Sequence, residues 1–189
     1  KIKCLNLEKL IKDCKKNNLK AQCDLYNTYK DILFTLSLKY CKNIEEAQDN
    51  LQDAFIEIFK NIKKYNGKGS FEGWIKRITI NKAIDKYKKE SYINIVINDD
   101  ILEDTTIDTD NLNVPLHIIL NLIQELPSRY RLVFNLYELD NYSHKEISKM
   151  LSITEGTSKS NLHRAKLILK ENIKKINESQ IHKIKHHGN

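Results

Sequence analysis

Apolar residues recur every three or four positions along most of this chain, a spacing that predicts amphipathic helices rather than strands. In the first half we expect helices over residues 5–16, 20–41, 44–64 and about 70–89. The pattern stops near residue 91 and returns after Pro115, with helices expected from Leu116, from Ser128, and over about 143–151 and 155–176. The sequence therefore predicts an all-α protein with two small helical domains.

The apolar side of each helix is the side expected to face the core. In the first domain the expected inward residues are Leu7, Leu10, Ile11, Cys14, Leu25, Tyr29, Ile32, Leu33, Leu36, Tyr40, Ile44, Ala47, Leu51, Phe55, Ile58 and Ile62. In the second domain they include Leu116, Ile119, Leu120, Ile123, Val133, Leu136 and Tyr137. The helix that begins near Ser70, a residue suited to an N-cap, is apolar on two sides. Its pattern does not decide which side is buried.

Charge divides the chain into three blocks. Residues 1–90 carry 20 Lys and Arg against 12 Asp and Glu, residues 91–125 carry 7 acidic residues and no Lys or Arg, and residues 126–189 carry 12 against 6. Two basic blocks suit a polyanion such as nucleic acid, although a lysine-rich composition alone also gives basic faces. Segment 91–113 is acidic and rich in Thr, Asn and Asp, which is typical of a flexible linker. We expect domains at 1–90 and 114–178, this linker between them, and a tail at 179–189.

Several classes of protein are excluded by what the chain lacks. With 5 Gly and 2 Pro in 189 residues, it has too few turn formers for a β-sandwich or barrel. No apolar run approaches the ~18 residues that cross a membrane, and no signal-peptide core stands at the start. We therefore expect a cytoplasmic protein without membrane insertion. Because the sequence begins with Lys1 rather than Met, we also expect further residues in front of it.

Metal and catalytic sites are not indicated. Cys4, Cys14, Cys23 and Cys41 form no CxxC pair, so we interpret them as free thiols, three of them packed in the first domain. Near the end, His182, His186 and His187 are interpreted as a histidine-rich tail, with a metal site as the weaker alternative. No Ser–His or Cys–His pair stands in a recognisable context. We expect no cofactor, no metal and no enzymatic activity.

Residues 143–166, SHKEISKMLSITEGTSKSNLHRAK, have the pattern of a helix-turn-helix in which Thr154 caps the second helix. The inward residues would be Ile147, Leu151, Ser158, Leu162, Ala165 and Leu169. In this motif the second helix presents its outward residues to the major groove of DNA. The outward residues are Lys159, Ser160, His163 and Arg164, with Thr157 and Lys166 beside them. A basic helix hairpin without a role in DNA binding is the alternative.

A second pattern lies on the helix over 44–64. Opposite its apolar stripe stand acidic and amide residues around one isoleucine: Asp49, Gln52, Asp53 and Ile56. An exposed isoleucine among such groups is typical of a small protein interface. A single exposed apolar residue is also common on ordinary surfaces, so this pattern alone is a weak indication.

The third pattern, residues 63–90, combines aromatic residues, glycines and many lysines. Basic groups follow the backbone of a nucleic acid strand and aromatic rings stack on unpaired bases, so this segment suits single-stranded or melted DNA. The alternative, which we favour for Phe71 and Trp74 taken alone, is that these rings belong to the core. The candidate residues are Tyr65, Asn66, Gly67, Lys68, Ser70, Phe71, Trp74, Arg77, Asn81, Lys82 and Lys86.

The order of these three patterns resembles that of bacterial extracytoplasmic-function (ECF) sigma factors, the two-domain members of the sigma-70 family. The similarity extends from about Ala21 to Lys175. The segment EEAQDNLQDAFIEIF resembles region 2.2 of the family, and FEGWIKRITINKAIDKYKK resembles regions 2.3 to 2.4. LPSRYRLVFNLYELDNYSHKEISKMLSITEGTSKSNLHRAK resembles region 4. Each segment is moderately specific, and their order across an acidic linker is highly specific.

The resemblance implies a transcription initiation factor that binds core RNA polymerase and helps it open promoters. Asp49, Gln52 and Asp53 would contact the β′ clamp helices, and the C-terminal domain would meet the β flap. Residues 65–71 would capture a flipped base of the minus-ten element, with Asn81 lining the pocket. The strand backbone would be held by Arg77, Lys82 and Lys86. The minus-thirty-five element would be read by Lys159, Ser160, His163 and Arg164, and the linker would follow the RNA exit path.

Two residues depart from the family's pattern. Ser158 stands where the family usually has Val or Ile, which would remove one apolar anchor, a loss on the order of 1 kcal/mol. Asn161 stands where Arg or Lys is usual, and arginine makes a bidentate contact with guanine that asparagine copies poorly. We therefore hypothesise weak reading of the minus-thirty-five element, supplemented by another DNA-targeting partner. An anti-sigma factor is a further expected partner.

Two other function classes stay open at this point. A stand-alone helix-turn-helix regulator would act as a dimer on paired half-sites and would not need the outward acidic face of residues 49–56. An enzyme acting on nucleic acid should show clustered acidic metal ligands, and the sequence shows none.

Overall fold

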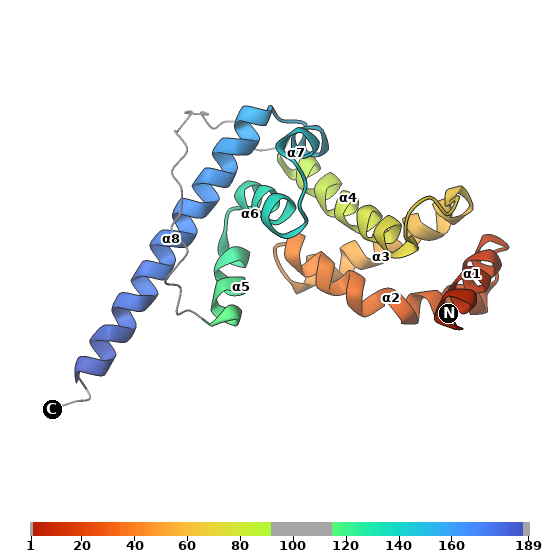
Figure 1. The fold of residues 1–189 in the computed structure, drawn as a ribbon, viewed down its shortest axis with the longest axis horizontal. Coiled ribbons are helices and arrows are strands. Elements are labelled where there is room, and N and C mark those ends of the chain that lie inside the picture. The colour runs from red at the N-terminus through yellow and green to blue at the C-terminus, as the bar shows by residue number, and fades with distance from the viewer. Residues whose placement is uncertain (1, 92–114, 187–189) are drawn as a thin grey trace. The chain divides into compact units, whose positions relative to one another are not determined.

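The computed structural model describes residues 2–91 and 115–186. The regular elements of these residues are all helices, and the chain divides into two compact units, Lys1–Ile93 and Asn94–Asn189 (Figure 1). The expected all-α class with two helical domains is confirmed. The expected linker lies outside the described residues apart from Ser91. Three further expectations concern side chains that the structure does not describe. They are the inward position of Leu116, the packing of Cys4 and the histidine-rich tail.

The N-terminal unit consists of α1 (Ile2–Lys15), α2 (Leu19–Tyr40), α3 (Ile44–Asn61), the short 3-10 helix η1 (Ile62–Lys64) and α4 (Phe71–Ser91). α2 packs against α1, α3 and α4, and α3 packs against α4. The largest fully buried apolar side chains of this unit come from α2, α3, η1 and α4: Leu25, Leu33, Ile58, Ile62 and Ile75. Burial of such residues is the main favourable term in its folding.

One buried polar contact joins three helices of this unit. The side-chain amide of Asn50 on α3 donates to the Ser37 hydroxyl of α2 at 2.9 Å and to the Thr79 carbonyl of α4 at 3.3 Å. All three residues are almost fully buried. Since a buried polar group is tolerated only when it is hydrogen-bonded, this network fixes which faces of the helices meet.

Several inward assignments in the N-terminal unit are wrong. Ile32 is 42% exposed because Leu33 and its neighbours already fill the inward stripe, and Ile44 is 58% exposed because it is the first residue of α3. Cys14 and Cys41 are buried free thiols, as expected, but Cys23 is exposed. Burial raises the pKa of the Cys14 thiol to about 11, which keeps it protonated.

The structure decides the question that the pattern of α4 left open. Its buried apolar residues are Phe71, Ile75, Ile80, Ala83 and Ile84. They form one broad inward face, whereas Trp74 and Ile78 remain partly exposed at its edge. Before the helix, the Ser70 hydroxyl accepts a hydrogen bond from the Gly73 amide at 3.0 Å, so the expected N-cap is confirmed.

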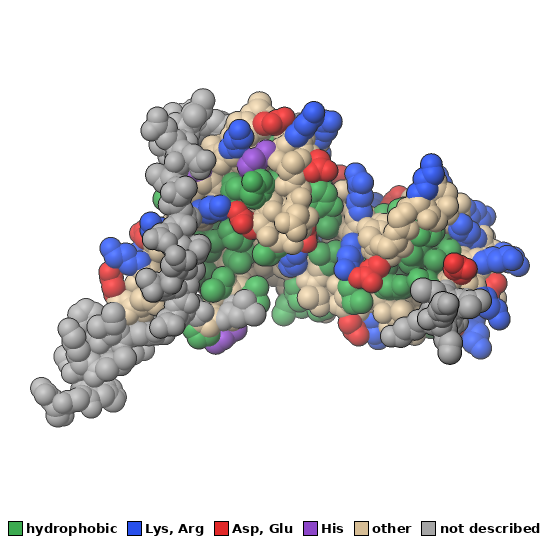
Figure 2. Space-filling view, in the orientation of Figure 1, with side chains coloured by type: hydrophobic (Ala, Val, Ile, Leu, Met, Phe, Trp, Pro, Cys, Tyr) green, Lys and Arg blue, Asp and Glu red, His purple; other side chains and the backbone are tan. Residues whose placement is uncertain are grey.

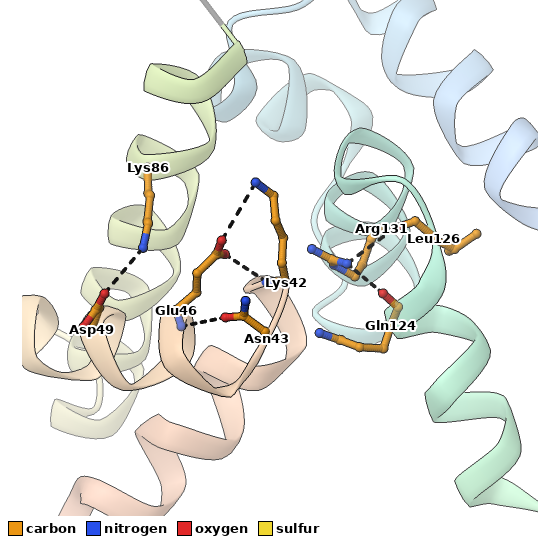
Figure 3. A network of polar contacts seen from close by, with 8 residues as sticks. All are labelled: Lys42, Asn43, Glu46, Asp49, Lys86, Gln124, Leu126 and Arg131. Atoms are coloured by element: carbon orange, nitrogen blue, oxygen red, sulfur yellow. Dashed lines mark hydrogen bonds and ion pairs between the residues drawn. The ribbon is translucent and has the colours of Figure 1, made fainter. Parts of the chain in front are cut away.

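The C-terminal unit consists of α5 (Leu116–Glu125), α6 (Ser128–Phe134), the π-helical turn η2 (Asn135–Leu139), α7 (His144–Leu151) and α8 (Glu155–His186). α8 is ten residues longer than the predicted 155–176. Its buried Ala165 and Leu169 pack with Leu122, Ile123, Leu126 and Tyr130. Buried Arg131 donates to the main-chain carbonyls of Gln124 and Leu126, joining α5 to α6 (Figure 3).

Two inward assignments in the C-terminal unit are also wrong. Leu120 is 52% exposed, because the inward side of α5 is formed by Leu122, Ile123 and the following Leu126. Tyr137 is 36% exposed and stacks on the His144 ring, with 4.4 Å between the centroids. The π-helical turn at residues 135–139 changes the direction of the side chains there, which a 3.6-residue period does not predict.

Candidate functional site

The outward face of α3 has the composition that the sequence indicated. Asp49, Gln52, Asp53 and Ile56 are all exposed, and Ile56 is 52% exposed. Their spacing of three and four residues places them on one side of the helix, away from buried Leu51 and its neighbours. An apolar side chain within a polar, acidic patch offers both burial and charge to a partner protein.

The start of α3 is fixed by local contacts. The Asn43 side chain accepts a hydrogen bond from the Glu46 amide at 2.8 Å, and the Glu46 carboxylate accepts one from the Lys42 amide at 3.0 Å (Figure 3). The Asn43 contact satisfies a main-chain donor that the first turn leaves without a helical partner, and the Glu46 contact ties the residue before the cap to that turn. They set the register at which Asp49 and the rest of the outward face emerge.

A groove of about 670 Å³ lies between the α3 face and the lysines of α4. Lys86 pairs with Asp49 at 3.9 Å, as Figure 3 shows, and Lys82 pairs with Glu57 at 3.0 Å. The hydrogen bond from Lys82 holds the pKa of the Glu57 carboxyl below its ordinary value. The acidic protein-binding candidates and the basic DNA-binding candidates therefore line one groove, formed by Asp49, Gln52, Asp53, Lys82, Asp85, Lys86, Lys88 and Lys89.

A smaller hollow of about 340 Å³ lies next to this groove. Trp74, Ile78, Asn81 and Lys82 of α4 line it together with Asn61 and Lys64 and two carboxylates, Glu57 and Asp85. An indole ring supplies a stacking surface, an amide supplies a donor and an acceptor, and an ammonium suits a phosphate. This combination fits one unpaired nucleotide.

The segment from Tyr65 to Ser70 forms a compact loop before α4. Gly67 and Gly69 both have φ of +79°, a conformation that glycine adopts at little cost. The Tyr65 hydroxyl donates to the Gly69 carbonyl at 2.9 Å, and the Lys68 amide donates to the Asn66 side chain at 3.1 Å. The Tyr65 ring lies 5.4 Å from Trp74 and 5.2 Å from Phe71, centroid to centroid. The loop is thus held by its own hydrogen bonds and by an aromatic cluster.

The C-terminal unit contains a well-capped helix-turn-helix. Ser143 and Glu146 form a capping box at the start of α7, and Ser152 ends that helix in the left-handed conformation, φ 58°. The Thr154 hydroxyl then accepts from the Thr157 amide at 3.0 Å and caps α8, as expected. The expected inward residues of both helices are buried: Ile147, Leu151, Ser158, Leu162, Ala165 and Leu169.

Comparison with known families identifies both units. The family described as Sigma-70 region 2 matches residues 25–92, and the one described as Sigma-70, region 4 matches residues 116–169. The ECF RNA polymerase sigma factor SigW of Bacillus subtilis is 29% identical over 187 residues, covering 90% of this chain and 98% of its own length. The chain belongs to the ECF group of the sigma-70 family. It is a transcription initiation factor, and a stand-alone regulator is not favoured.

A second sequence relative and one solved structure are also similar to the chain. The ECF RNA polymerase sigma factor SigM of Bacillus subtilis is 28% identical over 156 residues, covering 78% of this chain and 91% of SigM. The sigma factor RpoE of Bartonella quintana, solved in complex with the anti-sigma factor NepR, shares the fold. Its TM-score is 0.51 at 15% identity, and the match covers 80% of this chain and 95% of RpoE.

The minus-ten candidates of this sigma factor line two hollows, which the contact between the Tyr65 and Trp74 rings connects. Tyr65, Asn66 and Gly67 line a hollow on the side of α1, whereas Trp74, Asn81 and Lys82 line the hollow between α3 and α4. Asn81 and Tyr65 thus line different hollows, and the expectation that Asn81 takes part in base capture stays a prediction. Of the remaining loop and helix candidates, those exposed or partly exposed are Lys68, Ser70, Arg77 and Lys86.

Phe71 is the clearest correction within this set. Its side chain is 3% exposed and lies edge-on to buried Tyr29, with 5.8 Å between the ring centroids. A ring enclosed in this way has no free face on which a base could stack. Phe71 belongs to the core, as the alternative interpretation of the sequence held, whereas Trp74, the other aromatic candidate of α4, remains partly exposed.

The minus-thirty-five candidates lie on α8, but they are not equally accessible. Lys159 is exposed, whereas Thr157, Ser160, His163, Arg164 and Lys166 are partly buried. Lys166 pairs with Glu138 at 2.8 Å, and Arg164 donates to the Tyr130 hydroxyl at 3.4 Å. Both cations thus have partners within the unit.

The two departures from the family pattern have structural explanations. Ser158 is fully buried, and its hydroxyl lies 2.9 Å from Nδ1 of His144, so a hydrogen bond replaces the apolar anchor. The expected loss of about 1 kcal/mol at Ser158 stays a prediction, to which this hydrogen bond adds a compensating contact. Asn161 is 5% exposed, so it faces the core rather than DNA. Having Asn161 in place of Arg or Lys therefore does not by itself weaken recognition of the minus-thirty-five element. The argument for weak recognition that rested on Asn161 is wrong.

Basic side chains occur in several separate groups on the N-terminal unit. Figure 2 shows Lys and Arg spread over the visible face of this unit rather than gathered at one point.

In the part of the chain that the structure describes, no three His, Cys, Asp or Glu residues are grouped to hold a metal ion. None of the described helices has the length and apolar character to span a membrane.

Proposed function

We propose that this chain binds core RNA polymerase through the outward face of α3 and promoter DNA through α4, the 65–70 loop and α8. The observation that carries the proposal is the groove between α3 and α4, where an acidic face with one exposed isoleucine adjoins a row of lysines. A protein partner and a DNA strand could be held side by side there. The helix-turn-helix would add a second DNA contact.

In the polymerase contact, Asp49, Gln52 and Asp53 would meet basic residues of the β′ clamp helices, and Ile56 would be buried at the centre. Opposite charges steer the encounter, and the apolar side chain adds affinity once water is excluded. The C-terminal unit would bind the β flap, and the acidic segment 91–113 would lie along the RNA exit path.

In promoter opening, the protein would exchange base pairing and stacking in DNA for contacts of its own. Trp74 and Asn81 would receive one unpaired base, and the 65–70 loop would select another. Arg77, Lys82 and Lys86 would hold the strand backbone. Stacking on an aromatic ring stabilises each captured base by about 1–3 kcal/mol, which offsets the cost of unpairing.

The chemistry of RNA synthesis would remain with the polymerase, so the chain itself would be no enzyme. It would act in the cytoplasm, where polymerase and promoter DNA are found. An anti-sigma factor that covers the α3 face would be the simplest inhibitor, because it would block the polymerase contact directly. A separate DNA-targeting protein would assist at promoters whose minus-thirty-five element is read weakly.

A retention assay with immobilised core RNA polymerase tests the polymerase contact. Asp49→Lys with Asp53→Lys should reduce retention at least ~100-fold, since each reversal replaces attraction with repulsion. The matched control is Asp24→Lys with Asp31→Lys, the same charge change on exposed residues of α2. The proposal fails if the wild-type chain is not retained, or if both double variants behave alike.

A further inference from the structure

One side chain of α1 reaches the 65–70 loop. The ammonium of Lys15 donates a hydrogen bond of 2.6 Å to the main-chain carbonyl oxygen of Tyr65. The same ammonium lies 5.9 Å from the centroid of the Tyr65 ring. α1 also packs against η1, the short helix that leads into the loop, and Ile11 and Cys14 of α1 are buried. Apolar packing thus fixes α1, and Lys15 extends from it to the loop.

Tyr65 is the residue at which the loop leaves the helical core. Its amide donates to the Ile62 carbonyl at 3.2 Å, and its hydroxyl donates to the Gly69 carbonyl at 2.9 Å. Its own carbonyl accepts from Lys15. Of these three bonds, only the one from Lys15 comes from outside residues 62–69. It is also the charge-assisted one, a type about twice as strong as a bond between neutral groups.

The direction of the Tyr65 carbonyl sets the plane of the following peptide, and hence the path of the chain through Asn66. The glycines at 67 and 69 allow many alternative paths, because glycine restricts φ so little. At the far end, the loop is fixed by the Ser70 cap of α4. At the near end, the Tyr65 ring is held by Phe71 and Trp74, and the bond from Lys15 is the contact that fixes the direction of the Tyr65 carbonyl.

We propose that Lys15 is a positioning residue for base selection: its bond to the Tyr65 carbonyl holds the 65–70 loop in the shape that selects an unpaired base of single-stranded DNA. This inference rests on the proposed role of the loop in promoter opening. Lys15 acts through the loop, so its loss reduces selectivity between bases more than it reduces overall affinity for DNA.

Lys12 supplies a matched control. It is exposed on the same helix and lines the same hollow of about 360 Å³ as Lys15, Tyr65, Asn66 and Gly67. The hydrogen bond to the loop comes from Lys15. Lys15→Met and Lys12→Met therefore remove the same charge from one region of the surface. A general electrostatic attraction to DNA would be weakened equally by both changes.

The direct test measures base selection by the complex of core polymerase with the full chain. The complex is incubated with a pool of random-sequence single-stranded DNA, and the bound fraction is sequenced. For Lys15→Met we expect the enrichment of the preferred base, at the most strongly selected position of the DNA, to fall about tenfold. A change of this size corresponds to the loss of one hydrogen bond. Lys12→Met and Lys15→Arg should keep enrichment near the wild-type level, since arginine retains a charged donor.

The outcomes separate this inference from the proposed function. If the wild-type complex selects no base, or does not form, the proposed function fails. If the wild type selects a base and Lys15→Met selects it equally well, the role of Lys15 is wrong. Equal losses in Lys15→Met and Lys12→Met would also contradict it, because they would indicate charge alone.

Hydrogen exchange of the free chain gives a second test that needs no DNA. The amides of residues 66–70 should exchange faster in Lys15→Met than in Lys12→Met, while protection in α2–α4 stays unchanged. Methionine keeps the apolar stem of the side chain, so the fold should be maintained. Unchanged loop exchange, or a general loss of protection, would overturn the proposal, the latter because Lys15 would then support the whole unit.

Discussion

At the scale of single residues, the structure shows how lysines and carboxylates share the groove between α3 and α4. Lys82 is 30% and Glu57 35% exposed, so their pair is screened by solvent and contributes little to folding. Its importance is local, because it fixes the position of an ammonium proposed to hold DNA. In a complex with DNA, a phosphate would compete with Glu57 for that ammonium.

The ion pair between Lys82 and Glu57 predicts the direction in which the pKa of Glu57 is shifted. Because Lys82 stabilises the carboxylate, the Glu57 pKa should lie below its ordinary 4.5, and Lys82→Met should return it toward that value. The stabilisation is fully present above about pH 4.5 and is lost as the pH falls through the lowered pKa. Carbon-13 NMR of the side-chain carboxyl measures this directly. An unchanged titration in Lys82→Met would show that the pair does not form in solution.

Tyr65 supports a second prediction at this scale. Its ring packs on Trp74 and Phe71, and its hydroxyl closes the loop onto Gly69. Tyr65→Ala should weaken open-complex formation at least ~10-fold, because one stacked or selected base is lost, while leaving polymerase retention near wild type. Permanganate footprinting reports the unpaired thymines. Equal losses in footprinting and retention would mean that the loop is structural only.

At the scale of elements, much of the helical pattern could be predicted from the sequence, and the errors have physical causes. The helical period identifies a stripe but not its width, so Ile32 at the edge and Ile44 at a helix start were assigned to the core. The exposed Tyr137 reflects a π-helical turn, which has no signal in a 3.6-residue pattern. Contacts between elements, such as His144 with Ser158, depend on packing that no local pattern encodes.

The candidate binding surfaces were also predictable only in part. The sequence could predict the exposed face of α3, because that face lies opposite a clear apolar stripe. Its residues are Asp49, Gln52, Asp53 and Ile56. The sequence could not predict that Tyr65 and Asn81 line different hollows, because this depends on how the loop lies between α1 and α4. Lys15 was missed for the same reason, since nothing in the sequence of α1 marks a partner fifty residues away.

The network around Asn50 gives a prediction for the packing of elements. Asn50→Ala should lower the free energy of unfolding of the N-terminal unit by about 2–3 kcal/mol, since two buried hydrogen bonds are lost and a cavity remains. Gln48→Ala, an exposed change on the same helix, should stay within about 0.5 kcal/mol. Urea unfolding followed by the fluorescence of Trp74, the single tryptophan, measures both. Similar values for the two variants would contradict the network's importance.

At the scale of the whole molecule, we expect the two helical units to contribute unequally to promoter recognition. The N-terminal unit combines the acidic α3 face, which is proposed to bind polymerase, with two hollows and many lysines. Among the minus-thirty-five candidates on α8, Lys159 is the one that is fully exposed, while Arg164 and Lys166 have partners within the unit. We therefore retain the hypothesis that the minus-thirty-five element is read weakly, on this new basis.

This inequality predicts how promoter changes affect transcription. Replacing the whole minus-thirty-five element should reduce initiation less than ~10-fold, whereas replacing the minus-ten element should reduce it more than ~100-fold, given typical costs of about 1–3 kcal/mol per mismatched base pair. Quantitative transcription from paired templates compares the two losses. A minus-thirty-five effect as large as the minus-ten effect would disprove weak reading.

Run-off transcription tests the central claim most directly, that one chain joins polymerase to selected promoters. Purified core RNA polymerase is supplied with a promoter library, with and without the full chain, and the start sites are sequenced. We expect start sites downstream of a shared minus-ten sequence only when the chain is present, and their loss with Asp49→Lys and Asp53→Lys. The same start sites with core polymerase alone would contradict it.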